Sequence, residues 1–335
     1  MLPMENLPFH DGNIYNLIEN RHYEVRRDVD HTLQMHSSFI RRLSQETELE
    51  GHQGCVNSVA WNSKGSLLIS GSDDTQMNIW SYNSRKLLYS IDTGHSANIF
   101  CTRFVPETSD ELVVSGAGDA EVRLFNLSRL SGRTPDDNAI APLALYQCHT
   151  RRVKKLAVES GNPNVVWSAS EDGTLRQHDF REGNSCPPAG SSHQECRNIL
   201  VSANTVATCH CEYVASGSDD GRWYIWEKKT GRLVKILHGD EAVVNCVQGH
   251  PYNSVVATSG IDNTIKIWSP NASVPSVVAG GAAGPETADM LDIMENNQRK
   301  LCRKREAILP FELLERFRLR EFTEGTFHPF ECAQS

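Results

Sequence analysis

One pattern of three positions recurs five times between residues 49 and 270 and limits the folds open to this chain. Each copy ends at an aromatic residue or a His, with an Asp six residues earlier and a Ser or Thr ten residues earlier. Successive copies of the Asp lie 45, 53, 48 and 42 residues apart, which suits a repeating unit of four short strands. The five copies are Ser70, Asp74 and Trp80; Ser115, Asp119 and Phe125; Ser168, Asp172 and His178; Ser216, Asp220 and Trp226; and Thr258, Asp262 and Trp268. Because a unit of this size cannot bury its own faces, the units must stack on one another.

A His adds a fourth member to three of the copies. It stands 22 to 24 residues before the Asp as His52, His95 and His149, and the fifth copy has Asp240 there instead. We expect Asp, His, hydroxyl and indole to form one buried chain of hydrogen bonds, which is tolerated only if every member is satisfied. A Ser-His-Asp hydrolase would need an exposed nucleophile and an oxyanion site, so these residues predict structure and not catalysis.

The residues around these positions resemble the WD-repeat family. The resemblance covers about Leu49 to Pro270 and is carried by Gly51-His52 with Trp80, Gly94-His95, Gly71 to Asp74, Gly217 to Asp220 and Ile261 to Trp268. It implies an all-β fold, a WD-repeat β-propeller with about five recognisable blades and helical extensions at both ends. It also implies that the strand before Gly51 pairs with the last unit. The family usually has about seven blades, so a ring of five blades is either incomplete or closed with a less comfortable blade shape.

The fourth unit departs from the pattern. Leu200 to Ser216 runs without Gly or Pro where a turn belongs, and its His is missing, which suggests a deletion junction near residue 200. The predicted domains are an N-terminal helical arm (1–43), the propeller (44–270) and a linker with a helical tail (271–335). The predicted units are 44–93, 94–147, 148–190, 196–237 and 238–270.

The arm and the tail have two interpretations each. Asn13 to Leu43 lacks Gly and Pro and has apolar residues at roughly helical spacing. It is either a helix packed on the edge of the main domain or an arm that docks in a partner's groove, with Phe39 and Ile40 as candidate anchors. The basic run between residues 299 and 305 is either a nuclear-import signal or a solvated helix face.

Composition narrows the class of protein. The net charge of −9 argues against nucleic acid as a direct partner, although a local basic patch stays possible. The ten Cys are scattered, as is typical of reduced thiols in a cytosolic or nuclear protein. We find no signal peptide and no run long enough to span a membrane, and we expect a cytoplasmic or nuclear location. No cofactor or metal is expected, since His193, Cys196, Cys209, His210 and Cys211 lack the ordered spacing of a zinc site.

The third unit ends in a sequence that the other units do not repeat. His178-Asp179-Phe180-Arg181 resembles the W-D-x-R box of WD-repeat substrate receptors of cullin-4 ubiquitin ligases, with His in place of Trp. The Arg is a long side chain that can fork onto carbonyls or a carboxylate, and the Asp can orient it. Trp226 to Lys229 is a weaker version that ends in Lys. An ordinary blade turn explains the four residues nearly as well.

The chain as a whole is similar to the WD and tetratricopeptide repeat family of cullin-4 ligase-associated factors. His36 to Gly65 and Tyr213 to Ser335 carry this resemblance, while the middle repeats of that family are lacking. It implies a non-catalytic substrate receptor that docks on the ligase's linker protein, the damaged-DNA-binding adaptor, through the arm and Asp179, Arg181 and Lys229. The protein substrate is unknown. The alternatives are a general WD-repeat scaffold or peptide-binding protein with no ligase role, and a shortened chain without a stable function.

Overall fold

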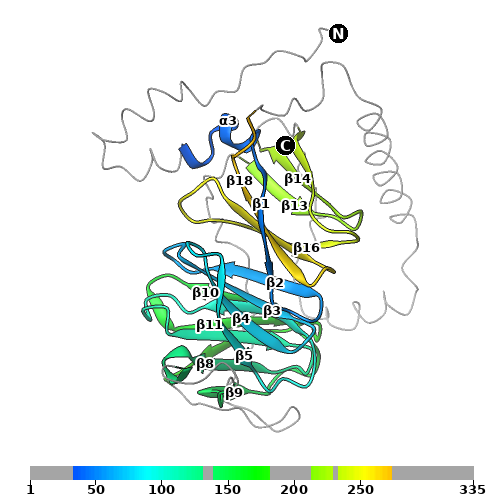
Figure 1. Cartoon of the computed structure of the whole chain (residues 1–335). Helices are drawn as coiled ribbons and strands as arrows, with labels where there is room; N and C mark the ends of the chain where they lie inside the picture. Colours follow the sequence, from blue (N-terminus) through cyan, green and yellow to red (C-terminus); the bar gives the residue numbers. More distant parts are fainter. Residues whose placement is uncertain (1–32, 131–138, 182–212, 229–232, 274–335) are drawn as a thin grey trace, which may run out of the picture. The chain divides into compact units, whose positions relative to one another are not determined.

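The computed structural model describes residues 33–130, 139–181, 213–228 and 233–273 (Figure 1). In these ranges the chain forms strands β1 to β18, a short helix α3 (Ser37–Ile40) and a 3₁₀ turn η2 (Leu127–Leu130). The all-β fold expected from the repeats is therefore confirmed. The predicted helical tail, most of the N-terminal arm and the suspected junction near residue 200 lie outside the described residues. No helix in the described part has the length and apolar character needed to span a membrane.

The strands form five antiparallel sheets in the described residues, which we call blades 1 to 5. Blade 1 contains β2 (Val56–Trp61), β3 (Leu67–Ser72), β4 (Gln76–Ser81) and β5 (Lys86–Asp92). Blade 2 contains β6 (Ile99–Phe104), β7 (Leu112–Ala117), β8 (Val122–Asn126) and β9 (Ala144–Tyr146). Blade 3 contains β10 (Val153–Glu159), β11 (Asn162–Ser170) and β12 (Leu175–Asp179), and blade 4 contains β13 (Tyr213–Gly217), β14 (Arg222–Glu227) and β15 (Leu233–His238). Blade 5 contains β16 (Val244–Gly249), β17 (Val256–Gly260) and β18 (Thr264–Ser269).

The strand before Gly51 completes the last blade. β1 (Ser44–Glu50) pairs antiparallel with β18, so that Thr47 lies opposite Ile267 and Leu49 opposite Ile265 (Figure 1). This pairing joins the start of the repeats to their end, as the resemblance to WD repeats predicted. Because Leu49 and Ile265 are both buried, one face of β1 is part of the core between blades 5 and 1.

The hydrophobic core lies between neighbouring blades. Each strand alternates side chains between the two faces of its sheet, so a blade can present apolar side chains to the preceding blade on one face and to the following blade on the other. Four clusters fill the spaces between blades 1 and 2, 2 and 3, 5 and 1, and 4 and 5. The innermost strands come close at Gly71, where an added Cβ would lie 2.5 Å from Ile99 Cγ2 of the next blade.

Blades 3 and 4 each have apolar residues that are less buried than the equivalent residues of blade 1. On blade 3, Trp167 and Leu175 are half-buried, whereas the equivalent Ile69 and Met77 of blade 1 are fully buried. On blade 4, Val214 is 49% exposed. The described strands thus form four blade junctions, and none of comparable extent joins β10–β12 to β13–β15.

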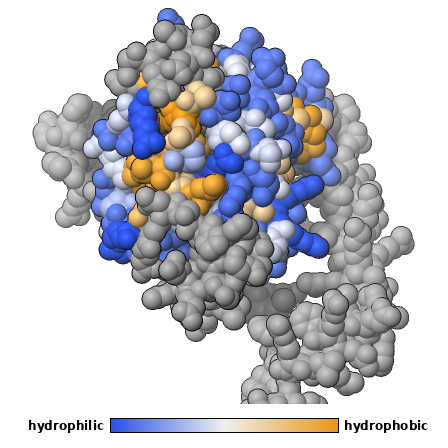
Figure 2. Space-filling view, turned by 90° about the horizontal axis from the view of Figure 1, so that it is seen from below, coloured by the Kyte–Doolittle hydropathy of each residue, from blue (hydrophilic) through white to orange (hydrophobic). Residues whose placement is uncertain are grey.

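The face seen from below has many hydrophilic residues, with apolar residues between them (Figure 2). Outer strand β5 contributes Leu87, Leu88 and Tyr89, each about two-fifths exposed. Single exposed apolar residues are normal on a protein surface, whereas three in succession on an edge strand are uncommon.

Candidate interaction surface

The repeat pattern brings four side chains together in blade 1. Asp74 Oδ2 lies 2.9 Å from His52 Nδ1, and His52 Nε2 lies 2.8 Å from Ser70 Oγ. Trp80 donates its indole N–H to the same Ser70 oxygen at 2.9 Å. Ser70 and His52 are buried, and the network joins the loop before β2 to the turn between β3 and β4.

Blades 2 and 3 repeat this arrangement with a different last member. His95 lies between Asp119 and Ser115 at 2.9 and 2.8 Å, but Phe125 has no N–H to donate to Ser115.

In blade 3, His149 lies between Asp172 and Ser168 at 2.9 and 2.7 Å. His178 Nε2 then lies 2.7 Å from Ser168 Oγ and takes the place of the indole nitrogen. His178 is buried, and its other ring nitrogen, Nδ1, has no hydrogen-bond partner among the described residues.

Protonation in the blade 3 network follows from burial and hydrogen bonding. Burial opposes the charged form of Asp172, but hydrogen bonds from Thr174, His149 and the backbone outweigh it and hold the pKa of this carboxyl well below its ordinary value. Burial also lowers the pKa of His149. The pair therefore consists of a carboxylate and a neutral imidazole, which donates from Nδ1 and accepts the Ser168 proton at Nε2.

Blade 5 brings together only part of its predicted set. Trp268 donates to Thr258 Oγ1 at 2.8 Å, as in blade 1. Asp240 replaces the His and accepts from the backbone N–H groups of residues 242, 243 and 262. Asp262 pairs instead with Lys266 at 2.6 Å, since Asp240 already holds the backbone of its turn.

Blade 4 does not bring its predicted members together. Ser216 is exposed and donates to the carbonyl of Gly217, while Asp220 accepts from the Tyr224 hydroxyl. Trp226 lies opposite Val214 in the ladder and makes no bond to Ser216. The expectation that Ser216, Asp220 and Trp226 share one network is therefore wrong for the described residues. The physical reason is that Ser216 is exposed, whereas the corresponding hydroxyl of each other unit is fully buried.

The sequence after the third blade forms a compact turn at the end of β12. Arg181 Nε lies 2.9 Å from Asp179 Oδ1, and the same carboxylate oxygen accepts the backbone N–H of Arg181. This pairing lowers the pKa of Asp179. Phe180 stacks near Tyr146 of blade 2, with ring centroids 6.4 Å apart. Asp179 thus orients Arg181, whose side chain is 64% exposed.

Of the other predicted partner-binding residues, Ile40 lies inside the fold. Its side chain is 7% exposed and packs with Leu43, Trp223 and Trp268 between blades 4 and 5. This is the packed-helix alternative, and Ile40 is not accessible as an anchor in this arrangement. Phe39 is half-buried and lies edge-on to His36. Lys229 lies outside the described residues.

Long-range hydrogen bonds hold this part of the arm against blades 4 and 5. Gln34 donates to the carbonyls of His250 and Asn253, and Ser254 donates back to the Gln34 carbonyl. Lys235 donates to the Arg41 carbonyl at 2.8 Å, and burial lowers the pKa of its amine to about 8. These partners could not be predicted from the sequence, because they lie about 200 residues apart along the chain.

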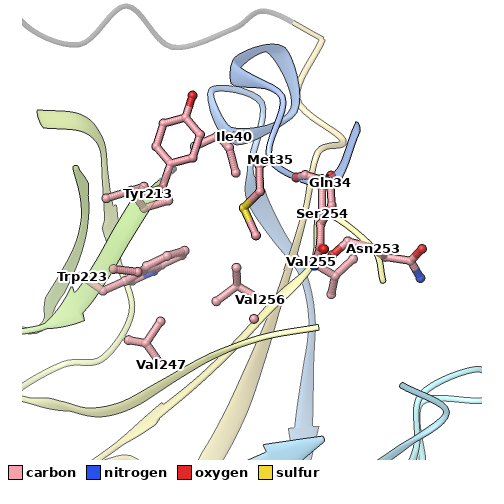
Figure 3. A pocket seen from close by; sticks show the side chains of 13 residues that line it. Gln34, Met35, Ile40, Tyr213, Trp223, Val247, Asn253, Ser254, Val255 and Val256 are labelled. Carbon is pink, nitrogen blue, oxygen red and sulfur yellow. Dashed lines mark hydrogen bonds between the residues drawn. The ribbon is translucent and has the colours of Figure 1, made fainter. Parts of the chain in front are cut away.

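A pocket of about 190 Å³ remains below the arm (Figure 3). Met35 points into it from the arm, and Trp223 and Val256 line its floor. The lining is mainly apolar, and Trp223 Nε1 has no hydrogen-bond partner among the described residues. The pocket shares lining residues with the core between blades 4 and 5, so we interpret it as a packing defect next to the arm.

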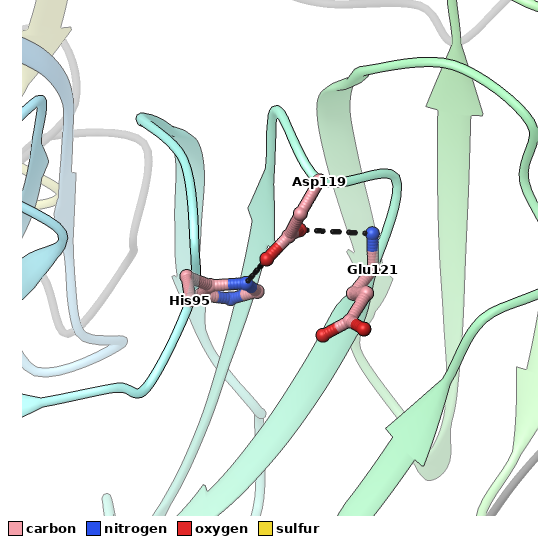
Figure 4. Close-up of side chains that lie close together, drawn as sticks. All are labelled: His95, Asp119 and Glu121. Carbon is pink, nitrogen blue, oxygen red and sulfur yellow. Dashed lines mark hydrogen bonds and ion pairs between the residues drawn. The ribbon is translucent and has the colours of Figure 1, made fainter.

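One cluster has the composition of a metal site but the geometry of the repeat network. His95, Asp119 and Glu121 lie close together in blade 2 (Figure 4). Asp119 accepts from His95 and from the backbone N–H of Glu121. The Glu121 carboxylate is already held by Arg123 at 2.9 Å and by Gln147 at 2.6 Å. The ligand atoms are thus engaged by protein donors.

Comparison with known proteins agrees with this geometry. The model of the WD domain, G-beta repeat, matches residues 42–81 and 231–269. Protein ALTERED SEED GERMINATION 2 from Arabidopsis thaliana is 33% identical in an alignment that covers 99% of this chain and 100% of that protein. The chain belongs to the WD-repeat family. That alignment has 757 positions and this chain has 335 residues, so more than half of the positions hold no residue of this chain.

Two human relatives match over shorter stretches. WD and tetratricopeptide repeats protein 1 is 44% identical over 144 residues, which is 43% of this chain and 20% of that protein. DDB1- and CUL4-associated factor 6 is 34% identical over 193 residues, which is 57% of this chain and 22% of that protein. The chain therefore spans about a fifth of the length of each of these two relatives.

Proposed function

We propose that this WD-repeat protein is a non-catalytic substrate receptor of a cullin-4 RING ubiquitin ligase. WD repeats are protein-interaction scaffolds, and the name of one relative records its association with DDB1 and CUL4. In this proposal the chain docks on the ligase's linker protein and presents a protein substrate. We place it in the cytoplasm or nucleus, where such an assembly would act.

The observation that carries the proposal is the exposed and oriented Arg181. Its guanidinium stands at the end of β12, held by Asp179 on one side, with Phe180 packed inward beneath the turn. A planar guanidinium matches carbonyl or carboxylate oxygens of a partner in a way that Lys does not. A pre-oriented side chain also loses less conformational entropy on binding than a freely rotating one.

Co-purification of the linker protein with tagged full-length chain tests the proposal. We expect both Arg181→Ala and Arg181→Lys to reduce recovery by about tenfold or more, since losing a charge-assisted contact costs about 1.5–3 kcal/mol. Lys64→Ala, which removes a 70% exposed cation elsewhere, serves as the matched control and should leave recovery unchanged. Equal recovery for all four proteins would refute docking through Arg181.

The arm needs a separate pair of variants because part of it belongs to the core. Phe39→Ala should reduce recovery of the linker protein with a smaller fall in melting temperature than Ile40→Ala, since Phe39 is only half-buried. Ile40→Ala should lower the melting temperature, because Ile40 fills the space between blades 4 and 5. If Phe39→Ala binds like the wild type, the arm has no docking role.

The alternative is a general scaffold without a ligase role. It would be favoured if proteins recovered with the wild-type chain included no subunit of a cullin ligase. A different alternative, a shortened chain without a stable function, would be favoured if the purified protein showed no cooperative thermal transition.

A further inference from the structure

Blade 3 begins with a dense group of cations that the proposed function does not use. Arg151, Arg152, Lys154 and Lys155 fall within five residues, in the loop before β10 and at its start. Arg151, Arg152 and Lys155 are exposed, and the Lys154 side chain is 43% exposed. We call these four residues the basic cluster. It stands out in a chain with a net charge of −9.

The fold does not require cations at these positions. The first strands of blades 1, 2, 3 and 5 are β2, β6, β10 and β16. Each has a register shift directly after its first residue, so the four strands can be aligned residue by residue from this shift. At the places of the two Arg, the other blades have Gly54 and Cys55, Ala97 and Asn98, and Ala242 and Val243. At the places of the two Lys, they have Asn57 and Ser58, Phe100 and Cys101, and Asn245 and Cys246. Neutral residues build the same loop and strand three times, so the charges serve another purpose.

The backbone that carries the two Arg is fixed by the repeat network. Thr150 donates its N–H to Asp172 at 3.1 Å, and Ser170 donates to the Arg151 carbonyl at 2.9 Å. The backbone N–H of residue 171 bonds to the Arg152 carbonyl at 3.0 Å. Exposed cations on a rigid backbone form a pre-organised surface, and this lowers the entropic cost of binding.

The basic cluster has an excess of positive charge. Its single ion pair among the described residues joins Lys154 to Glu171 at 3.7 Å. Lys154 Nζ also lies 3.5 Å from the centre of the Phe100 ring, which provides an apolar neighbour.

We propose that the basic cluster binds an acidic peptide segment of a partner protein. Arg forks onto carboxylates in pairs of parallel hydrogen bonds, and neighbouring Lys adds attraction without strict geometry. A long nucleic acid is disfavoured, because the rest of the chain is acidic and would repel a polyanion that extends beyond one blade.

The basic cluster and the turn at Arg181 lie at different places on blade 3. The cluster lies where β10 begins, and Arg181 follows the end of β12. Since β10, β11 and β12 run alternately up and down, these two points lie at opposite ends of blade 3. The acidic-peptide site therefore does not rest on docking to the ligase, and the two sites can be occupied together.

Fluorescence anisotropy with the full-length chain tests this proposal. The probe is a labelled peptide rich in Asp and Glu, compared with a peptide of equal length in which Asn and Gln replace them. We expect the double variant Arg151→Ala with Arg152→Ala to raise the Kd for the acidic peptide by about tenfold, and added salt to weaken binding. Lys64→Ala with Lys86→Ala removes the same charge from two exposed sites elsewhere, and its Kd should stay within about twofold of wild type.

The outcomes separate specific from general attraction. Similar melting temperatures for both double variants would show that lost affinity is not lost folding. The proposal is overturned if the wild type does not bind the acidic peptide, or if it binds the neutral peptide equally well. It is also overturned if both double variants weaken binding alike, or if a single-stranded oligonucleotide of equal charge binds more tightly than the peptide.

Discussion

Ser70→Ala removes the hydroxyl that joins His52 to Trp80 in blade 1. The side chain of Ser70 is fully buried, and its oxygen lies 2.8 Å from His52 Nε2 and 2.9 Å from Trp80 Nε1. Alanine fits the space but leaves both nitrogens without a partner. Each unsatisfied buried polar group costs about 1–3 kcal/mol, so the expected loss in the free energy of unfolding is about 2–6 kcal/mol.

The same change in the next blades provides graded comparisons. Ser115 has one partner in the network, His95, because Phe125 cannot donate, and Ser115→Ala should cost about 1–3 kcal/mol. Ser168→Ala should cost as much as Ser70→Ala, since His178 supplies the second bond there.

Among the described residues, the exposed Ser216 bonds only to its neighbour's carbonyl. Ser216→Ala is therefore the matched control and should change stability by less than about 0.5 kcal/mol.

Urea unfolding of the full-length variants, followed by circular dichroism, measures these differences as shifts of the midpoint at constant slope. The expected order of loss is Ser70→Ala and Ser168→Ala, then Ser115→Ala, then Ser216→Ala. Equal losses for Ser70→Ala and Ser115→Ala would refute the idea that the count of orphaned partners sets the cost. A large loss for Ser216→Ala would show that blade 4 closes its network in solution.

Three further changes test other contacts. Burial lowers the pKa of His149 in the folded protein, so the unfolded state binds more protons as the pH falls below about 6.5. The free energy of unfolding should therefore decrease on acidification. The melting temperature should drop from pH 7 to pH 5, and it should drop less in His149→Gln. Gly71→Ala should lower the free energy of unfolding in urea by about 1–3 kcal/mol, since its Cβ would meet Ile99. Gly249→Ala has open space around its Cβ and should change stability by less than about 0.5 kcal/mol. Equal losses for the two variants would contradict the steric explanation. The pKa of Lys235 is lowered to about 8 from 10.5, so stability should rise between these pH values in the wild type, and a parallel rise in Lys235→Met would contradict that origin.

The repeat residues could be placed from the sequence because each is local to its unit. The hydroxyl, Asp and last position of a unit lie within eleven residues of one another, and a meander of short strands fixes how they meet. Even the role of His178 as a substitute for Trp followed from its place in the pattern. The prediction for blade 4 was wrong because Ser216 is exposed there, and the repeat pattern does not encode burial.

Tertiary structure alone decided which residues of the arm are accessible. Phe39 and Ile40 are neighbours in an apolar stretch, yet Ile40 is buried between blades 4 and 5 and Phe39 is half-buried. The arm is held by carbonyls near residue 250, and no local pattern can encode a contact across about 200 residues. Likewise, the strand register was needed to recognise the run from Arg151 to Lys155 as unusual. It aligns blade 3 with three other blades, which have neutral residues at the positions of the four cations. Spacing along the chain determines what repeats with a fixed period, whereas burial depends on which distant surfaces finally pack together.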